Sequence, residues 1–193
     1  MKKVSLFVAV ILLITACKKN NSTAPEPALL EHYPQKWILT LDEAPDKYFF
    51  LKTNGAVMYR DHVPRSYSLT QLAIDEQCEF EVNTSRTEDG GKVCFTLRLD
   101  KNKKIWCGAG PSSNKQEVHM YALNTTSTDP GDGYKFFVHK MPDAGGVKTV
   151  VLESVQYPGY FVSIASPGSQ FAQNLVTLQK ASSPEKATAW QCR

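Results

Sequence analysis

Short runs of apolar residues alternate with clusters of turn residues along most of this chain. Beyond residue 32, no stretch of the sequence keeps apolar residues at the spacing of a helix. The runs are rich in β-branched and aromatic residues, which favour strands. The sequence therefore predicts strands at 37–41, 48–52, 56–59, 68–74, 78–82, 93–99, 105–107, 118–123, 134–139, 149–155, 160–164, 175–179 and 188–192.

The predicted strands repeat with a common stride. Phe80, Phe136 and Trp190 are 56 and then 54 positions apart, and Trp106 and Phe161 are 55 apart. One such unit cannot bury its apolar face, whereas three around an axis can, and closure removes exposed sheet edges. We predict an all-β domain, a β-trefoil of three four-stranded repeats closing a six-stranded barrel. The alternative is a two-sheet sandwich with chance similarity of spacing.

The segment LESVQYPGYFV at 152–162, followed by LVTL at 175–178, carries a family resemblance. It resembles the strand–turn–strand unit of β-trefoil proteins, and is similar to the interleukin-one-like cytokines and to the arabinose-binding modules of arabinofuranosidases. Pro158 presets φ and Gly159 accepts a positive φ, so the turn itself is mostly structural. The resemblance implies the fold and says little about the ligand.

The N-terminus has the three zones of a secretory signal peptide. Lys2 and Lys3 precede an apolar run of 11 residues at 4–14, and small residues follow. A membrane-spanning helix needs about 20 apolar residues, so we predict a cleaved signal at 1–16. Ile14-Thr15-Ala16-Cys17 resembles the lipobox of bacterial lipoproteins, with Ile14 where leucine is usual. The alternative is an ordinary signal peptide that leaves a free thiol.

The lipobox resemblance implies that Cys17 is acylated, for example with palmitate, and anchors the chain. Lys18 stands where an aspartate would favour inner-membrane retention, so the resemblance implies an outer-membrane lipoprotein of the cell envelope, facing the periplasm or the exterior. Residues 17–31 are polar and contain prolines, which predicts a flexible tether before a domain at 32–193.

Charge and cysteine content narrow the classes of partner. Without Lys2 and Lys3 the chain has 20 basic and 19 acidic side chains and no basic stripe, so we expect no nucleic-acid partner. Four cysteines remain after lipidation, and an exported chain is expected to form one or two disulfides among them. The four are Cys78, Cys94, Cys107 and Cys192. Their spacing leaves open all three ways of joining them into two disulfides.

Signals for catalysis, metals and cofactors are weak. The four histidines lack metal-ligand spacing, and no nucleophile elbow or phosphate loop is present in the sequence. Cys107 fits a half-buried or disulfide-bonded strand cysteine better than a nucleophile. Asp129 and Asp132 lie in a glycine-rich loop that does not match a calcium-binding loop. Carboxylates such as Asp42 and Glu43 fall at predicted turns. We expect no enzyme, no metal and no cofactor.

A glycan is the first predicted ligand, because sugars stack on aromatic faces beside fixed polar groups. The candidate residues are Tyr157, Tyr160, Trp106 and Tyr48, with Asn54 and Asn174 as polar partners. Two family motifs are absent: the Gln-x-Trp signature of ricin-type lectins, and the histidine that follows the aromatic pair in arabinose-binding modules. The alternative is a protein-binding trefoil, cytokine-like or inhibitor-like, that uses the loops at 82–92, 108–116 and 123–133.

Replacing Cys17 by serine tests the lipid anchor. The variant should lose incorporation of a labelled palmitate analogue and should leave the membrane fraction, because acyl chains contribute roughly 0.8 kcal/mol per buried methylene. Labelling that persists in Cys17→Ser, or membrane association without any label, would contradict the prediction.

Overall fold

A computed structural model describes residues 35–52, 65–71, 78–88, 90–100, 102, 104–111, 117–165 and 175–193. The signal, the tether and Cys17 lie outside the described residues. So do the predicted strand at 56–59, Asn54 and Asn174. Within the described ranges, no helix is both long and apolar enough to cross a membrane. The only regular helices in these ranges are two 3-10 turns, η2 (Asp132–Tyr134) and η3 (Pro184–Lys186).

Six antiparallel strands close into a ring. Within the ring each strand pairs with two neighbours, in the order β1–β4–β5–β8–β9–β12 and back to β1. Closure leaves no free edge in this ring. The six strands are β1 (Lys36–Leu41), β4 (Glu79–Arg86), β5 (Val93–Leu99), β8 (Phe136–Ala144), β9 (Val147–Ser154) and β12 (Trp190–Cys192).

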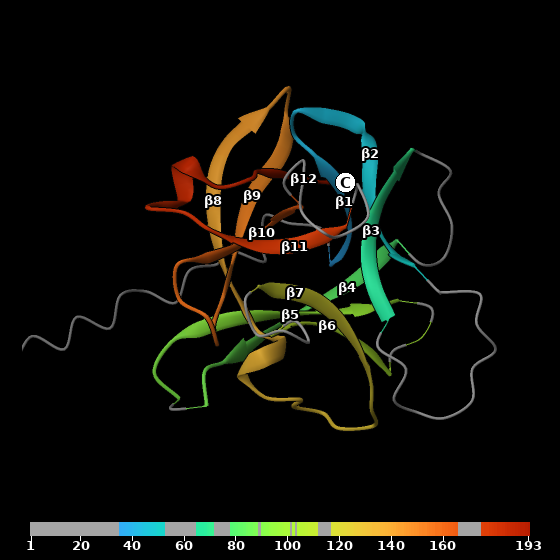
Figure 1. The fold of residues 1–193 in the computed structure, drawn as a ribbon, viewed down its shortest axis with the longest axis vertical. Helices are drawn as coiled ribbons and strands as arrows, with labels where there is room; N and C mark the ends of the chain where they lie inside the picture. The colour runs from blue at the N-terminus through green and yellow to red at the C-terminus, as the bar shows by residue number, and fades with distance from the viewer. Residues whose placement is uncertain are drawn as a thin grey trace, which may run out of the picture.

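The other six strands in the described part of the chain form three hairpins that meet one another (Figure 1). β3 pairs with β7, β7 pairs with β11, and a bridge between Ser68 and Leu175 joins the first hairpin to the third. This arrangement of a closed barrel and three joined hairpins is consistent with a β-trefoil. The hairpins are β2 (Ala44–Lys52) with β3 (Arg65–Gln71), β6 (Ile105–Pro111) with β7 (Val118–Asn124), and β10 (Tyr160–Ile164) with β11 (Val176–Lys180).

The barrel interior contains the aromatic residues that recur along the sequence. Phe80, Phe136 and Trp190 are each 0% exposed and belong to one core cluster. Phe49 links two of them, with its ring centroid 5.2 Å from Phe80 and 5.8 Å from Trp190. The predicted common interior of the repeats is therefore confirmed.

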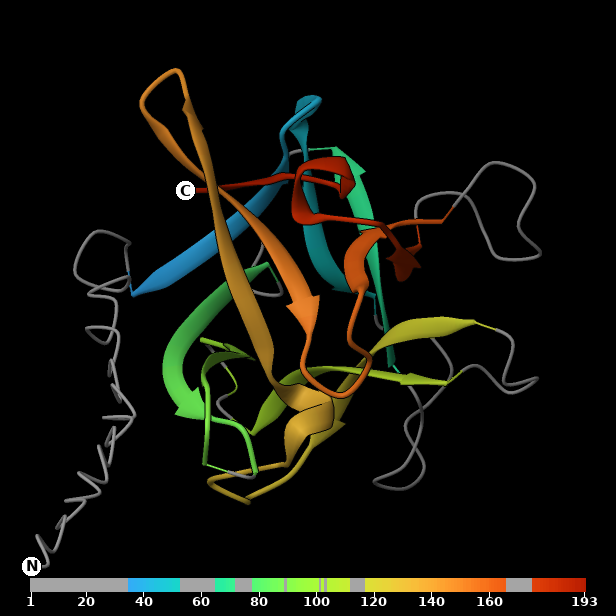
Figure 2. The ribbon, with the colours of Figure 1, turned by 90° about the vertical axis from the view of Figure 1, so that its left-hand side faces the viewer.

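One predicted turn is shorter than expected. The sequence predicts strands at 134–139 and 149–155 with turn residues between them, but β8 continues to Ala144 and only Gly145 and Gly146 turn, with φ of 57° and 82°. The register of β8 against β9 shifts between Met141 and Ala144, and Pro142 lies in this shift, where no ladder donor is required. The result is a long β8–β9 hairpin that projects from the barrel at the upper left of Figure 2.

The expected disulfides are corrected by the structure. All four described cysteines are buried thiols and no two of them are joined. Across the ladders, Cys94 lies opposite Ser85, Cys107 opposite Leu97, and Cys192 opposite Leu39. Burial raises the pKa of the Cys94 thiol to about 11 and also raises that of Cys192, so both disfavour the reactive thiolate. These cysteines act as small core residues.

Two neighbouring phenylalanines of β8 offer a matched test of the core. Phe136 is fully buried, whereas Phe137 is half-buried on the outer face, where the Lys92 ammonium lies 5.5 Å from its ring. Phe136→Ala should lower the free energy of unfolding by about 3–5 kcal/mol because it leaves a cavity. Phe137→Ala should cost about 1 kcal/mol. Urea unfolding measures both, and equal costs would contradict the assignment of the interior.

Candidate functional site

The turn between β9 and β10 is held by its own polar contacts. Tyr157 N–H donates to Ser154 Oγ at 3.2 Å, and Tyr160 N–H donates to Tyr157 O at 3.0 Å. Gly159 has φ of 79°, as expected from the sequence. Its N–H donates to Glu153 Oε1 at 2.8 Å. Backbone and side-chain hydrogen bonds thus fix the position of both tyrosines.

Tyr157 and Tyr160 form an aromatic pair on this turn. Their ring centroids are 6.4 Å apart at an interplanar angle of 70°, which is an edge-to-face contact. Both side chains are half-buried and pack against the core. The structure therefore brings together two of the predicted aromatic residues, each with part of its surface open to solvent.

A contact between Glu153 and His139 supports the turn. Glu153 uses Oε1 to accept from Gly159, and its Oε2 lies 2.7 Å from His139 Nε2 on β8. The His139 ring contacts the buried Phe161, with centroids 6.0 Å apart. Glu153 is thus the residue through which β8, β9 and the tyrosine turn are joined.

Trp106 and Tyr48 do not join this pair. Trp106 is 4% exposed, and the Arg98 guanidinium lies 5.5 Å from its ring centroid. Tyr48 is 1% exposed. Neither ring has an open face on which a sugar can stack, so both are corrected to buried packing residues. Alternation along a strand does not reveal which aromatic residue another element will cover.

A cleft where the first repeat meets the third was not predicted from the sequence. It has a volume of about 440 Å³ and lies where the β1–β2 turn meets the end of β10 and the segment around η3. Its apolar lining includes Leu41, Met141 and Ile164, and its polar lining includes Ser163 and Thr188, whose hydroxyls are 2.6 Å apart. Ser163 and Thr188 come from different segments of the chain. Among the lining residues, only Asp42 and Glu43 stood out in the sequence, as carboxylates at predicted turns.

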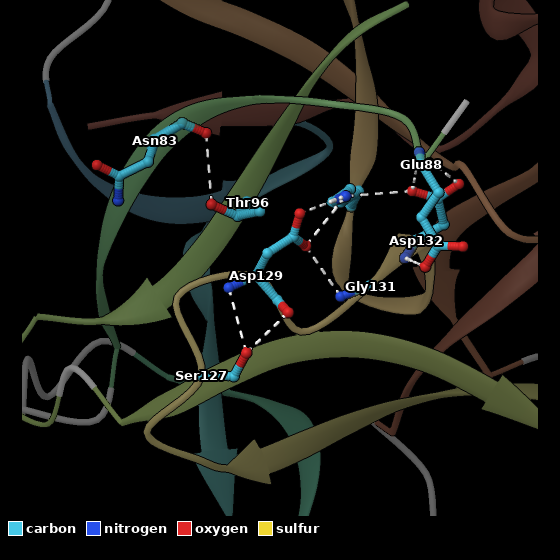
Figure 3. A network of polar contacts seen from close by, with 8 residues as sticks. Asn83, Glu88, Thr96, Ser127, Asp129, Gly131 and Asp132 are labelled. Carbon is cyan, nitrogen blue, oxygen red and sulfur yellow. Dashed lines mark hydrogen bonds and ion pairs between the residues drawn. The ribbon is translucent and has the colours of Figure 1, made fainter. Parts of the chain in front are cut away.

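The aspartates considered for calcium have other partners. Figure 3 shows Asp129 and Asp132 in the loop between β7 and β8, close to Glu88. The Lys135 ammonium, on a side chain only 1% exposed, lies 3.0 Å from Asp129 and 3.3 Å from Asp132. Asp132 also accepts from the Glu88 N–H at 3.0 Å. Among the described residues no group of three or more metal-ligating side chains occurs.

The ionisation of this network follows from its contacts. The hydrogen bond from the Gly131 N–H lowers the pKa of Asp129, and the contact with Lys135 lowers it further. Burial opposes the charge of Lys135, but the hydrogen bonds to Asp129 and Asp132 outweigh burial, and the pKa of Lys135 is raised. The contact between Asp129 and Lys135 therefore attaches the 129–132 loop to the barrel, with both of these groups charged.

Comparisons with known proteins identify the fold alone. No protein-family model matches the chain, and no curated protein matches it. Among solved structures, it is similar to Gallus interleukin-1 beta at 13% identity and a TM-score of 0.52, over 82% of this chain and 95% of that one. It is also similar to a Macrolepiota procera ricin B-like lectin in complex with lactose, at 15% identity and a TM-score of 0.52, over 83% and 95%. A mosquitocidal holotoxin matches at 9% identity and a TM-score of 0.55, over 82% of this chain but only 17% of the toxin.

Removing one charge from the Lys135 network should destabilise the fold. We expect Asp129→Asn to lower the free energy of unfolding at pH 7 by about 1–3 kcal/mol, because the buried ammonium loses a charged partner. The matched control is Asp143→Asn, which breaks the 2.7 Å pair with Lys148, a pair 32% exposed on each side. That change should lower the free energy of unfolding by clearly less, because exposed ion pairs contribute little to stability.

Acidification gives a second readout of the same pair. A carboxyl whose pKa is lower in the folded state contributes stability above its ordinary pKa and loses it as the pH falls through the lowered value. From about pH 5 to about pH 2, the unmodified chain should therefore lose more stability than Asp129→Asn. Parallel pH profiles for the two proteins would contradict the role of this carboxylate.

Proposed function

We propose that this chain is a β-trefoil lipoprotein of the bacterial cell envelope that binds an extracellular glycan and is not an enzyme. Cys17 carries the lipid, residues 17–31 form a tether between the membrane and the domain, and the domain presents the ligand site. The anchoring part of the proposal rests on the N-terminal sequence pattern. The binding part rests on the described domain.

The observation that carries the glycan proposal is the half-exposed Tyr157–Tyr160 pair on a fixed turn. An aromatic face offers the C–H surface of a sugar a place to stack, and a rigid turn reduces the ordering cost of binding. The likeness to a lectin in complex with lactose supports a binding role for this fold, although at 15% identity it brings no residue correspondence. A rigid barrel carrying a short turn with ligand groups is a common way to build such a site.

The position of two polar side chains beside the turn adds them to the proposed partners of the sugar. Glu153 and His139 adjoin the tyrosine turn, and their side chains are 17% and 33% exposed. Because a carboxylate and an imidazole both exchange hydrogen bonds with hydroxyl groups, they can orient a sugar that lies on the rings. Asn54 and Asn174 stay predictions from the sequence.

Tyrosine substitutions on the full chain, purified in detergent, test the proposal on a glycan array. Tyr157→Leu and Tyr160→Leu preserve apolar packing but remove the aromatic face, and each should weaken glycan binding by about tenfold or more. Tyr157→Phe should keep most of the affinity, because the ring remains. Phe50→Leu, at a half-buried aromatic residue in the first repeat, is the matched control and should bind as the unmodified chain does.

The folded state of each variant is checked by its thermal unfolding midpoint. Absence of binding to every glycan by the folded, unmodified chain would overturn the proposal. An equal loss of affinity in Phe50→Leu would also overturn it, since the effect would then not belong to the tyrosine turn.

A further inference from the structure

We infer that the cleft of about 440 Å³ is a second binding site, one that receives a lysine or arginine side chain of a protein partner. None of the described residues that line this cleft belongs to the tyrosine turn, and the inference does not depend on glycan binding. It rests on the form of the cleft, the nature of its floor and the charge of its rim.

The cleft forms where two repeats meet. Asp42 and Glu43 come from the turn after β1, while Ser163 and Ile164 come from the end of β10, and the segment after η3 closes the third side. Hydrogen bonds fix these walls: Asp42 N–H donates to Ala189 O at 3.1 Å, and Gln191 Nε2 donates to Asp42 Oδ1 at 2.9 Å. Because the walls are tied to the barrel, the cleft exists before a partner binds.

Apolar residues form much of the lining of the cleft. Leu41, Met141 and Ile164 provide its larger apolar side chains, and three alanines, at 165, 187 and 189, keep the walls close to the backbone. Such a surface suits the methylene stem of a lysine or arginine side chain, which packs along apolar groups while its charged end stays at the polar rim.

The cleft is lined by three carboxylates, those of Asp42, Glu43 and Glu185. Among the described residues that line it, none is a lysine, an arginine or a histidine. Hydrogen bonds from Ser183 and from its own backbone N–H lower the pKa of Glu185, so this carboxylate is charged at neutral pH. An ammonium or guanidinium group therefore meets complementary charge at the end of an apolar channel, whereas an acidic group is repelled.

The hydroxyl pair adds hydrogen-bonding capacity at the same place. Ser163 and Thr188 share one hydrogen bond at 2.6 Å, and two hydroxyls have more lone pairs than this bond uses. Gln179 donates to the Ile164 carbonyl at 2.7 Å, which holds the end of β10 in position beside them. A basic side chain thus finds carboxylates and hydroxyl oxygens within one hollow.

The test uses peptide probes on the full chain in detergent. The probes are acetyl-Ala-Ala-Lys-Ala-Ala-amide and versions with arginine, norleucine or glutamate at the centre. Backbone amide signals of Ser163, Ala165 and Thr188 should shift with the lysine and arginine peptides in NMR titration. Norleucine, which keeps the stem and lacks the charge, should bind at least about tenfold more weakly, and glutamate should give no shift.

A charge-matched pair of variants separates the cleft from the overall field of the protein. Glu43→Gln with Glu185→Gln removes two rim carboxylates and should weaken lysine-peptide binding by about tenfold or more. The double variant Asp100→Asn with Asp143→Asn removes two carboxylates outside the cleft and should leave lysine-peptide binding unchanged.

Three results would overturn the inference. One is an equal loss of affinity in both double variants, and another is equal binding of the norleucine and lysine peptides. The third is tighter binding of a glucosamine oligomer than of the lysine peptide at the same amide signals, which would assign the cleft to an amino sugar. None of these results bears on Tyr157→Leu, so the two proposals succeed or fail separately.

Discussion

Closure of the barrel is the constraint on which the rest of this structure depends. β1 pairs with β4 on one side and with β12 on the other, and Ile38 and Arg193 exchange backbone hydrogen bonds of 2.8 and 3.0 Å. Trp37, Phe80 and Trp190 fill the space behind this seam, and each is at most 1% exposed. Since the two ends of the domain meet here, the cleft walls and the support for the tyrosine turn all rest on a ring that is already shut.

Much of this architecture could be predicted, because apolar residues recur at equivalent positions in the three units of the sequence. Phe80, Phe136 and Trp190 mark the same place in three units, and burial of all three in one cluster confirms the pattern. The Pro158-Gly159 turn was also predictable, since only a few residue types accept its backbone angles. The end of β8 was not, because Pro142 within a register shift resembles a turn residue when only local sequence is considered.

The candidate site was only partly predictable, and the reason is the difference between local and tertiary information. Tyr157 and Tyr160 are close in sequence, so their pairing follows from the turn. Trp106 and Tyr48 have the same chemistry, but Arg98 lies against one ring and the surrounding strands bury the other. The cleft joins residues that are more than a hundred positions apart, and no periodicity announces such a meeting. Cys94, Cys107 and Cys192 likewise lie in strands whose facing residues only the register reveals.

The same seam has a consequence for how the chain reaches its folded state. Gln191 and Asp42, which contact one another beside it, are 149 positions apart in the sequence. Pairing such distant segments is slow, because the entropy of a long loop must be lost before any contact compensates for it. Until β12 arrives, β1 and β9 are open edges that can pair with other chains. Late closure therefore leaves these two strand edges open to pairing between chains until the ring is complete.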